Sequence, residues 1–136
     1  MISRVTAWGQ NAATHLLALI IAEAKMETAR FLNIVAIDCQ PEQEARFNKW
    51  YNEVHIPMLL KFDGMLGVTR YRLLGGSEGQ AKYLAIYEFT DKTSLDAYQK
   101  SPELAAARDE MNQTWKGKGF DIKWRAQYEP IKTWKS

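Results

Sequence analysis

The amino-acid sequence predicts a single α+β domain whose strands and helices follow the order β-α-β-β-α-β. Three observations support this prediction. Segments typical of strands occur four times, apolar positions at helical spacing occur in two regions, and prolines, glycines and capping residues separate these segments. This order is the ferredoxin-like arrangement, in which a four-stranded sheet carries both helices on one face.

The first strand and the first helix are expected in residues 30–60. Residues 30–39 (RFLNIVAIDC) are β-branched and apolar at both alternating positions, which indicates a strand buried from both sides. Pro41 then opens a helix, because a proline at the first helical position loses no hydrogen bond. The apolar stripe of this helix reaches Met58. Pro57 disfavours helical geometry at the residue before it, so we expect a break or kink at Ile56.

The other three strands are expected in residues 65–74, 81–89 and 120–130. Residues 65–74 and 81–89 form a hairpin around the glycine-rich loop at 75–80. Residues 120–130 show the clearest alternation, which predicts one buried face made by Ile122, Trp124, Ala126 and Tyr128.

A second helical region lies between the third and fourth strands. Thr93 and Asp96 have the spacing of a capping box, so this region is expected to begin there. Ser101, followed by a proline and a glutamate, indicates a fresh helix start. Gly117 and Gly119 are expected to end that helix.

The strand composition also predicts the order within the sheet and a partner for it. The first and third strands are the most apolar and should be central, whereas the second and fourth carry lysines and arginines, as edge strands do. Both faces of the third strand are apolar, but the two helices cover only one face. A second copy of the chain is the economical cover for the other face, so we expect a homodimer packed through the sheet faces.

The N-terminal segment, residues 1–25, is expected to be a helical or disordered extension of a domain that spans 26–136. Its longest apolar run covers residues 16–22, which is too short to cross a bilayer because a spanning helix needs about 20 residues. We therefore expect no membrane partner.

The charge and the cysteine count limit the possible partners and the compartment. Eighteen basic and sixteen acidic residues leave a net charge of +2 without a basic run, so nucleic acid is not expected as a partner. Cys39 is the single cysteine of the chain, which excludes an intrachain disulfide and favours a reducing, cytoplasmic location.

Two adjoining segments, WYNEVHIPMLL at 50–60 and FDGMLGVTRYRL at 62–73, resemble the dimeric α+β barrel superfamily and, within it, the EthD-like group. The first helix of that group ends in an aromatic pair, a short gap, then a histidine, any residue and a proline. Trp50, Tyr51, His55 and Pro57 occupy these positions here. The resemblance extends over residues 31–134 in the order of elements.

The resemblance implies a cavity between the sheet and the helices that takes aromatic or otherwise hydrophobic small molecules. Members include cyclases, dehydratases, isomerases and cofactor-free monooxygenases, so the fold alone does not choose the chemistry. We expect a small cofactor-independent enzyme that acts on such a ligand. The alternatives are a non-catalytic homodimer that binds a ligand or has a structural role, and a monooxygenase-type member of the superfamily.

His55 is the candidate catalytic acid or base. It lies four residues after Tyr51 on one helical face, and its expected place in the last turn favours the protonated ring through the helix dipole. Burial would favour the neutral ring, and a histidine balanced between these effects can exchange protons near pH 7. Alternatively, His55 is a C-terminal capping residue that bonds the last carbonyl groups.

Six further residues are candidates for contact with the substrate. The aromatic ones suit a planar ligand, and the asparagine interrupts an apolar strand, where its polar side chain needs a partner. These residues are Tyr51, Trp50, Asn33, Tyr71, Tyr83 and Trp124. The alternative is that the aromatic residues only build the core or the dimer contact.

No metal or other cofactor is expected. The two histidines, His15 and His55, are 40 residues apart and have no ligand spacing. The haem-degrading members of the superfamily carry a histidine on the second helix, and this sequence has none there.

Overall fold

The computed structural model describes residues 12–19 and 29–136. Residues 12–19 are helical, and the rest of the extension expected over 1–25 lies outside the described residues. Residues Arg30–Ile131 form one compact unit. Within the described ranges, no helix combines the length and the apolar character needed to cross a membrane.

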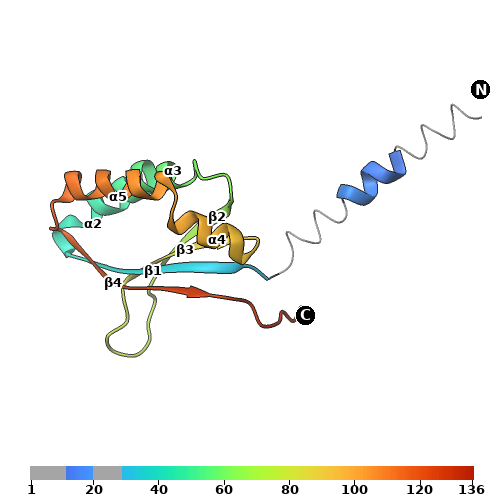
Figure 1. Ribbon diagram of the computed structural model, residues 1–136. Coiled ribbons are helices and arrows are strands. Elements are labelled where there is room, and N and C mark those ends of the chain that lie inside the picture. Colours follow the sequence, from blue (N-terminus) through green and yellow to red (C-terminus); the bar gives the residue numbers. More distant parts are fainter. Residues whose placement is uncertain (1–11, 20–28) are drawn as a thin grey trace, which may run out of the picture. The chain divides into compact units, whose positions relative to one another are not determined.

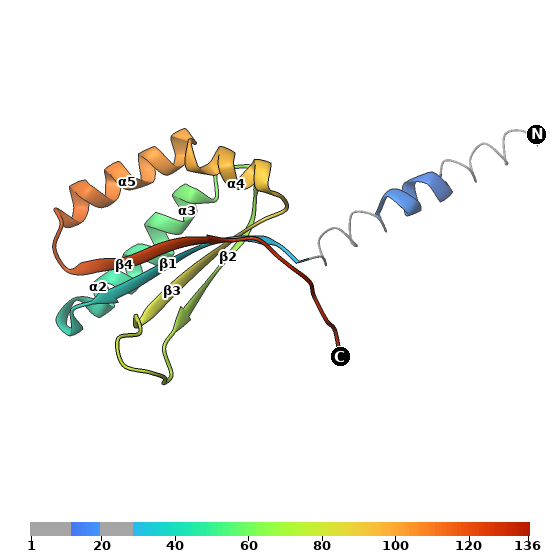
Figure 2. The same ribbon diagram turned by 60° about the horizontal axis from the view of Figure 1, so that its bottom comes forward.

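The compact unit is built on one antiparallel sheet with the strand order β2-β3-β1-β4. Its strands are β1 (Phe31–Cys39), β2 (Met65–Arg72), β3 (Tyr83–Phe89) and β4 (Phe120–Tyr128). The predicted ferredoxin-like arrangement is therefore confirmed, with the two most apolar strands in the centre. All helices of this unit lie on one face of the sheet, as both views show (Figures 1 and 2).

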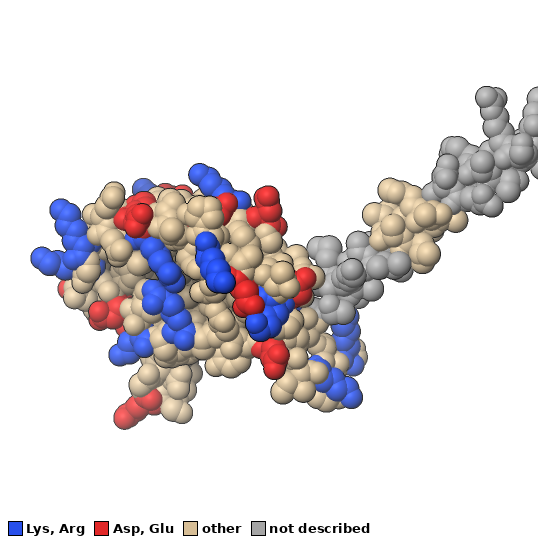
Figure 3. Space-filling model, viewed as in Figure 1, with Lys and Arg blue, Asp and Glu red and all other residues tan. Residues whose placement is uncertain are grey.

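The helical layer consists of one composite helix and two regular ones. The composite helix runs through a 3₁₀ turn (Pro41–Gln43), α2 (Glu44–Trp50), a π-helical turn (Tyr51–His55) and α3 (Ile56–Leu59). The regular helices are α4 (Lys92–Gln99) and α5 (Pro102–Trp115). On the face seen in Figure 3, basic and acidic side chains are interspersed.

Of the break or kink expected at Ile56, the break is wrong, because Ile56 keeps helical dihedral angles of φ −61° and ψ −46°. Its N–H donates to the carbonyl of Tyr51, five residues earlier, which closes the π-helical turn. In a regular helix the Pro57 ring would press against the carbonyl group of the preceding turn. The wider π-helical turn just before Pro57 relieves that contact, so the helix continues to Leu59.

The helix caps match the predictions in part. The N-cap residue of α4 is Asp91, whose carboxylate accepts a hydrogen bond from the N–H of Ser94 at 2.8 Å. The capping box expected at Thr93 is therefore wrong. Ser101 caps α5 as predicted, because its hydroxyl accepts from the N–H of Leu104 at 3.1 Å. The stop after α5 is also confirmed.

A bulge in β4 changes which side chains face the helices. Ala36 pairs with Trp124 and Ile37 pairs with Ile122, which leaves Lys123 as the extra residue. Residues directly opposite each other share a face, so the pairing of Arg125 with Val35 turns Arg125 toward the helices. The single buried face predicted for this strand is therefore wrong beyond Lys123, because one extra residue reverses the alternation.

The core fills the space between the helices and the sheet with aromatic rings. The side chains of β3 that face the helices are all buried, and helix residues pack on them. The fully or almost fully buried rings are Phe47, Tyr51, Tyr83, Tyr87, Phe89, Tyr98 and Trp115. The opposite sheet face keeps large apolar side chains exposed, among them Tyr71, Trp124 and Tyr128 at 51%, 42% and 51%.

Candidate functional site

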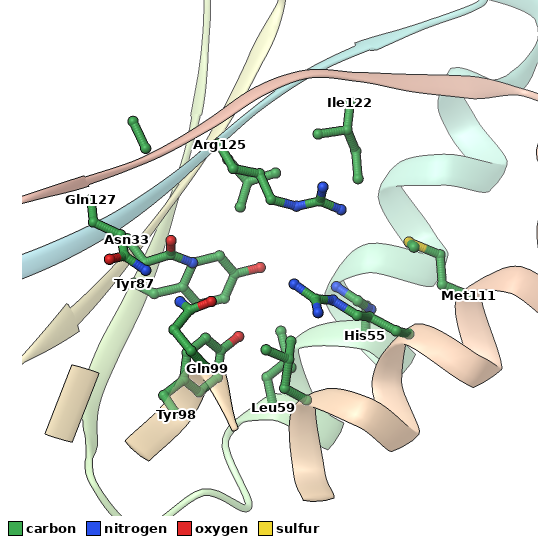
Figure 4. Close-up of a pocket in the computed structure, with 14 residues that line it drawn as sticks. Asn33, His55, Leu59, Tyr87, Tyr98, Gln99, Met111, Ile122, Arg125 and Gln127 are labelled. Carbon is green, nitrogen blue, oxygen red and sulfur yellow. The ribbon is translucent and has the colours of Figure 1, made fainter. Parts of the chain in front are cut away.

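A pocket of about 330 Å³ opens between the helical layer and the strands β1, β3 and β4. Its apolar wall consists of Val35, Leu59, Leu104, Met111, Ile122 and Ala126, and two tyrosines, Tyr87 and Tyr98, add aromatic surface. Its polar wall consists of Asn33, His55, Gln99, Arg108, Arg125 and Gln127. Figure 4 shows these side chains arriving from both the sheet and the helices. A mostly apolar pocket with a few polar groups is typical of a small-molecule site.

His55 is the last residue of the π-helical turn and is only 8% exposed. Its ring stacks on Trp50, with 4.8 Å between centroids, and meets the ring of Tyr51 at 4.9 Å. Its Nδ1 atom is enclosed and has no hydrogen-bond partner among the described residues. π-Helical turns of this kind often occur at functional sites.

Burial decides the protonation of His55. Desolvation lowers its pKa to about 4, with a smaller raising effect from Glu110 and a lowering one from Arg125. The expected effect of the helix dipole does not prevail, because α3 continues beyond His55 and places it in mid-helix. Within the described residues His55 bonds no terminal carbonyl group, so the capping alternative is wrong. The imidazole is therefore neutral at pH 7.

Trp50 and Tyr51 support the histidine from behind. Both are buried in the core, at 7% and 2% exposure, and neither lines the pocket. The indole Nε1 of Trp50 donates to the carboxylate of Glu110 at 2.8 Å, which ties this ring to α5. The two rings thus fix the position of the His55 ring from the helix side.

Buried tyrosines bring hydroxyl groups to the pocket. The hydroxyls of Tyr51 and Tyr87 lie 2.6 Å apart, and the Arg70 guanidinium lies 4.5 Å from the centre of the Tyr51 ring. Burial raises the pKa of Tyr51 to about 12 and also raises the pKa values of Tyr87 and Tyr98. All three hydroxyls are therefore protonated at neutral pH, and those of Tyr87 and Tyr98 come from residues that line the pocket.

Two arginines of the pocket were not predicted. Arg125 enters it because of the bulge in β4, and in Figure 4 its side chain extends from the strand into the cavity. Arg108 comes from α5, one turn after Leu104, where an exposed arginine gives no signal in the sequence. The alternation of β4 pointed the wrong way for Arg125, and only the strand pairing reveals its direction.

The structure separates the six residues predicted to contact the substrate. Asn33, 7% exposed, lines the pocket together with His55. Tyr83 is buried beside α2, and its hydroxyl accepts from Asn48 at 3.2 Å. Tyr71 and Trp124 lie on the opposite sheet face, where they line a separate groove of about 440 Å³. The register of β2 and the bulge in β4 place them there.

Residues 12–19 and 29–136 contain no candidate metal site. There, no group of three or more histidine, cysteine, aspartate or glutamate side chains is arranged to hold a metal ion.

The solved structures with a similar fold include the following three. An EthD family protein from Bacillus halodurans has a TM-score of 0.57 at 20% identity, over 74% of this chain and 99% of its own. A protein from Bordetella bronchiseptica, provisionally named an antibiotic biosynthesis monooxygenase, has a TM-score of 0.54 at 15% identity, over 76% and 99%. A dimeric ferredoxin-like protein of unknown function from Jannaschia has a TM-score of 0.53 at 15% identity, over 75% and 100%.

These similarities confirm, at the level of the fold, the resemblance to dimeric α+β barrel proteins and to the EthD-like group. No curated protein matches the chain. The family model described as a domain of unknown function, DUF4286, matches residues 30–124, which is more than half of the chain. The chain therefore belongs to the DUF4286 family.

Proposed function

We propose that this protein is a small enzyme in which neutral His55 acts as a general base on a hydrophobic, oxygenated small molecule. The observation that carries this proposal is the enclosed His55 ring, which borders the pocket and has an unpartnered Nδ1 among the described residues. A buried nitrogen without a hydrogen bond is costly to the fold, and a catalytic role is one of the reasons for which such a group is retained.

The weak basicity of His55 favours a particular kind of substrate. A base whose conjugate acid has a pKa of about 4 is weak, so its substrate must have an acidic C–H group, such as one between two carbonyl groups. In this step the C–H bond breaks, the proton moves to the imidazole, and the electron pair of that bond becomes part of an enolate. The protonated hydroxyls of Tyr87 and Tyr98 can donate to the enolate oxygen. Proton removal beside a carbonyl group is the first step of many cyclisations, dehydrations and isomerisations, and it needs no cofactor.

Deuterium uptake at carbon tests this role directly. A panel of planar β-dicarbonyl compounds is incubated with the protein in D₂O, and exchange at the acidic carbon is followed by NMR. The wild type should accelerate exchange of at least one compound, and His55→Gln should lose about 100-fold or more of that acceleration. Asp109→Asn, on the exposed side of α5, is the control and should keep it. Exchange as fast with His55→Gln as with the wild type would refute the role.

The alternative class is a binding protein without catalysis. It is supported by the same pocket, since a mostly apolar cavity also suits a carrier. If ligands bind the wild type but none of them exchanges its proton faster than in buffer, the protein is a binding protein and not an enzyme of this kind.

A monooxygenase-type reaction is the third alternative, and the similarity in fold to the Bordetella protein supports it. Consumption of dissolved oxygen with the same panel would favour that reading.

We also propose that the protein forms a homodimer through the open face of its sheet. Tyr71, Trp124 and Tyr128 are exposed on this face, and Leu84 and Ile86 line the groove between the first two. The Jannaschia protein, which has a similar fold, is described as dimeric. Native mass spectrometry should find a dimer at micromolar concentration. Trp124→Glu should shift it to monomer, whereas Ala105→Glu, which adds the same charge to an exposed position of α5, should not.

A cytoplasmic location is part of the same proposal. It rests on Cys39, which is half-buried and present as a free thiol. Free thiols persist best in reducing compartments. Fractionation of the source cells, with detection by an antibody against the compact unit, would test the location.

A further inference from the structure

The pocket beside His55 carries charge of only one sign. Arg108 and Arg125 both line it, and none of the described lining residues is acidic. The Glu110 carboxylate acts on His55 from α5, but it lies outside the lining and accepts hydrogen bonds from Trp50 and Thr114. Neither arginine forms a salt bridge within the part of the chain that the structure describes. Two guanidinium groups are therefore available to a ligand.

The direction of Arg125 depends on a departure from regular structure. Without the extra residue Lys123, the alternation of β4 would turn Arg125 to the face opposite the helices. Bulges commonly re-aim side chains beside active sites. In Figure 4 the guanidinium of Arg125 lies in the cavity between β4 and the helix that carries His55. The bulge thus brings a cation to the pocket and turns the large apolar ring of Trp124 away from it.

The remaining walls suit a flat apolar body. Val35, Leu59 and Met111 contribute aliphatic surface, and the Tyr87 and Tyr98 rings lie stacked with 6.2 Å between centroids. The amides of Asn33 and Gln127, which pair across β1 and β4, add neutral donors and acceptors. A ligand that satisfies all of these groups is flat and apolar over most of its surface and carries an anion at one end.

We infer that the pocket takes a ring-bearing carboxylic acid, whose carboxylate binds Arg125 and Arg108 while its ring packs on Tyr87, Tyr98 and the aliphatic wall. This inference rests on the proposed function and names the substrate class of the same site. A guanidinium matches the two oxygens of a carboxylate in bidentate geometry. A phosphate ester also matches guanidinium geometry, so it is the competing anion in the test.

The anchored carboxylate would also orient the substrate. Arg125 lies on β4 and His55 on the composite helix, so a ligand held at both points spans the pocket from sheet to helix. Holding a carbon acid beside its base converts an encounter into a positioned reaction. Arg125 and Arg108 are therefore assigned as substrate-binding residues, and His55 keeps the chemical step.

Matched probes test the carboxylate preference in the wild-type protein. The probes are 2-naphthoate, its neutral isostere 2-naphthamide, and 2-naphthyl phosphate, with affinities measured by isothermal titration calorimetry. Naphthoate should bind at least about tenfold more tightly than the amide, because a hydrogen bond to a charged group contributes more binding free energy than a hydrogen bond between neutral groups. This preference should shrink as salt rises from about 0.05 to 0.5 M.

Charge-removing variants assign the preference to the two arginines. Arg125→Gln and Arg108→Gln should each lower the affinity for naphthoate by about fivefold or more, and the affinity for the amide should stay within about twofold of the wild-type value. Lys49→Gln, an exposed cation of α2 away from the pocket, should leave all affinities unchanged. Thermal melting of each variant checks that the fold is intact.

The outcomes separate this inference from the proposed function. Equal affinity for naphthoate and naphthamide overturns the carboxylate inference and leaves the pocket and His55 standing. Tighter binding of 2-naphthyl phosphate than of naphthoate overturns it in favour of a phosphate ester. Failure of every probe to bind contradicts the pocket itself, and with it the proposed function.

Discussion

The imidazole of His55 lies stacked on the indole of Trp50, with 4.8 Å between the ring centroids and 28° between the ring planes. The indole is held in turn by its hydrogen bond to Glu110 on α5. One face of the imidazole therefore meets aromatic carbon instead of water. This enclosure makes the charged form of His55 unfavourable, and the pH behaviour of the protein should show it.

The stability of the fold should depend on pH through His55. The folded pKa of about 4 lies below the ordinary value of 6.5, so between these values the unfolded chain binds a proton that the folded chain does not. The free energy of unfolding should therefore fall as pH drops through this window, by about 3 kcal/mol in all. Urea unfolding at pH 7.5 and 4.5 measures the fall. In His55→Phe, which keeps a ring against Trp50, this part of the fall should be absent; an equal fall in both proteins would contradict it.

Two charge substitutions should move the pKa of His55 in opposite directions. Glu110 raises this pKa and Arg125 lowers it, both less than burial does. Glu110→Gln, whose amide oxygen can still accept from Trp50, should lower the pKa of His55, and Arg125→Gln should raise it. NMR titration of the ring measures both. Shifts of the same sign would show that the variants act by rearranging the pocket and not by charge.

The cap at Ser101 should contribute measurably to stability. Its hydroxyl accepts from the N–H of Leu104 and donates to the carbonyl of Tyr98 at 2.8 Å, and the residue is 6% exposed. Ser101→Ala removes both bonds and should lower the free energy of unfolding by about 1–2 kcal/mol. Ser77→Ala, in the exposed hairpin loop, is the control. A loss no larger than that of the control would mean that the cap is not stabilising.

Gly119 should not tolerate a side chain. Its φ is +94°, and a Cβ atom there would lie 2.7 Å from a ring carbon of Trp115. Gly119→Ala should therefore destabilise the protein by about 2 kcal/mol or more, since strain and a steric clash act together. Gly75→Ala, whose Cβ would meet nothing within 4 Å, should be nearly neutral. Similar melting temperatures for the two variants would contradict this account.

The order of the elements and the arrangement of the sheet were predictable because they depend on local pattern. The apolar run in residues 83–89 and the cap at Ser101 are both signals that lie within a few residues of the element they predict. The apolar character of β1 and β3 was enough to place them in the centre of the sheet.

The pocket was predictable only in part, because two irregularities build it. A π-helical turn carries His55 in mid-helix where Pro57 predicted an end, and the sequence offers no period for a single wide turn. The bulge at Lys123 is decided by the pairing of β4 with β1, where partner residues such as Ile37 and Ile122 are far apart in the chain. For this reason Arg125 was assigned to the wrong face and Trp124 to the pocket.

The titration of the His55 ring tests the central claim most directly, since the claim is that an enclosed, neutral imidazole borders the pocket. Long-range ¹H–¹⁵N spectra of the His15→Gln protein, in which His55 is the remaining histidine, would follow the ring nitrogens from pH 8 downward. We predict a ring that stays neutral until the pH approaches about 4. Protonation near the ordinary value of 6.5 would show a solvated ring and contradict the account.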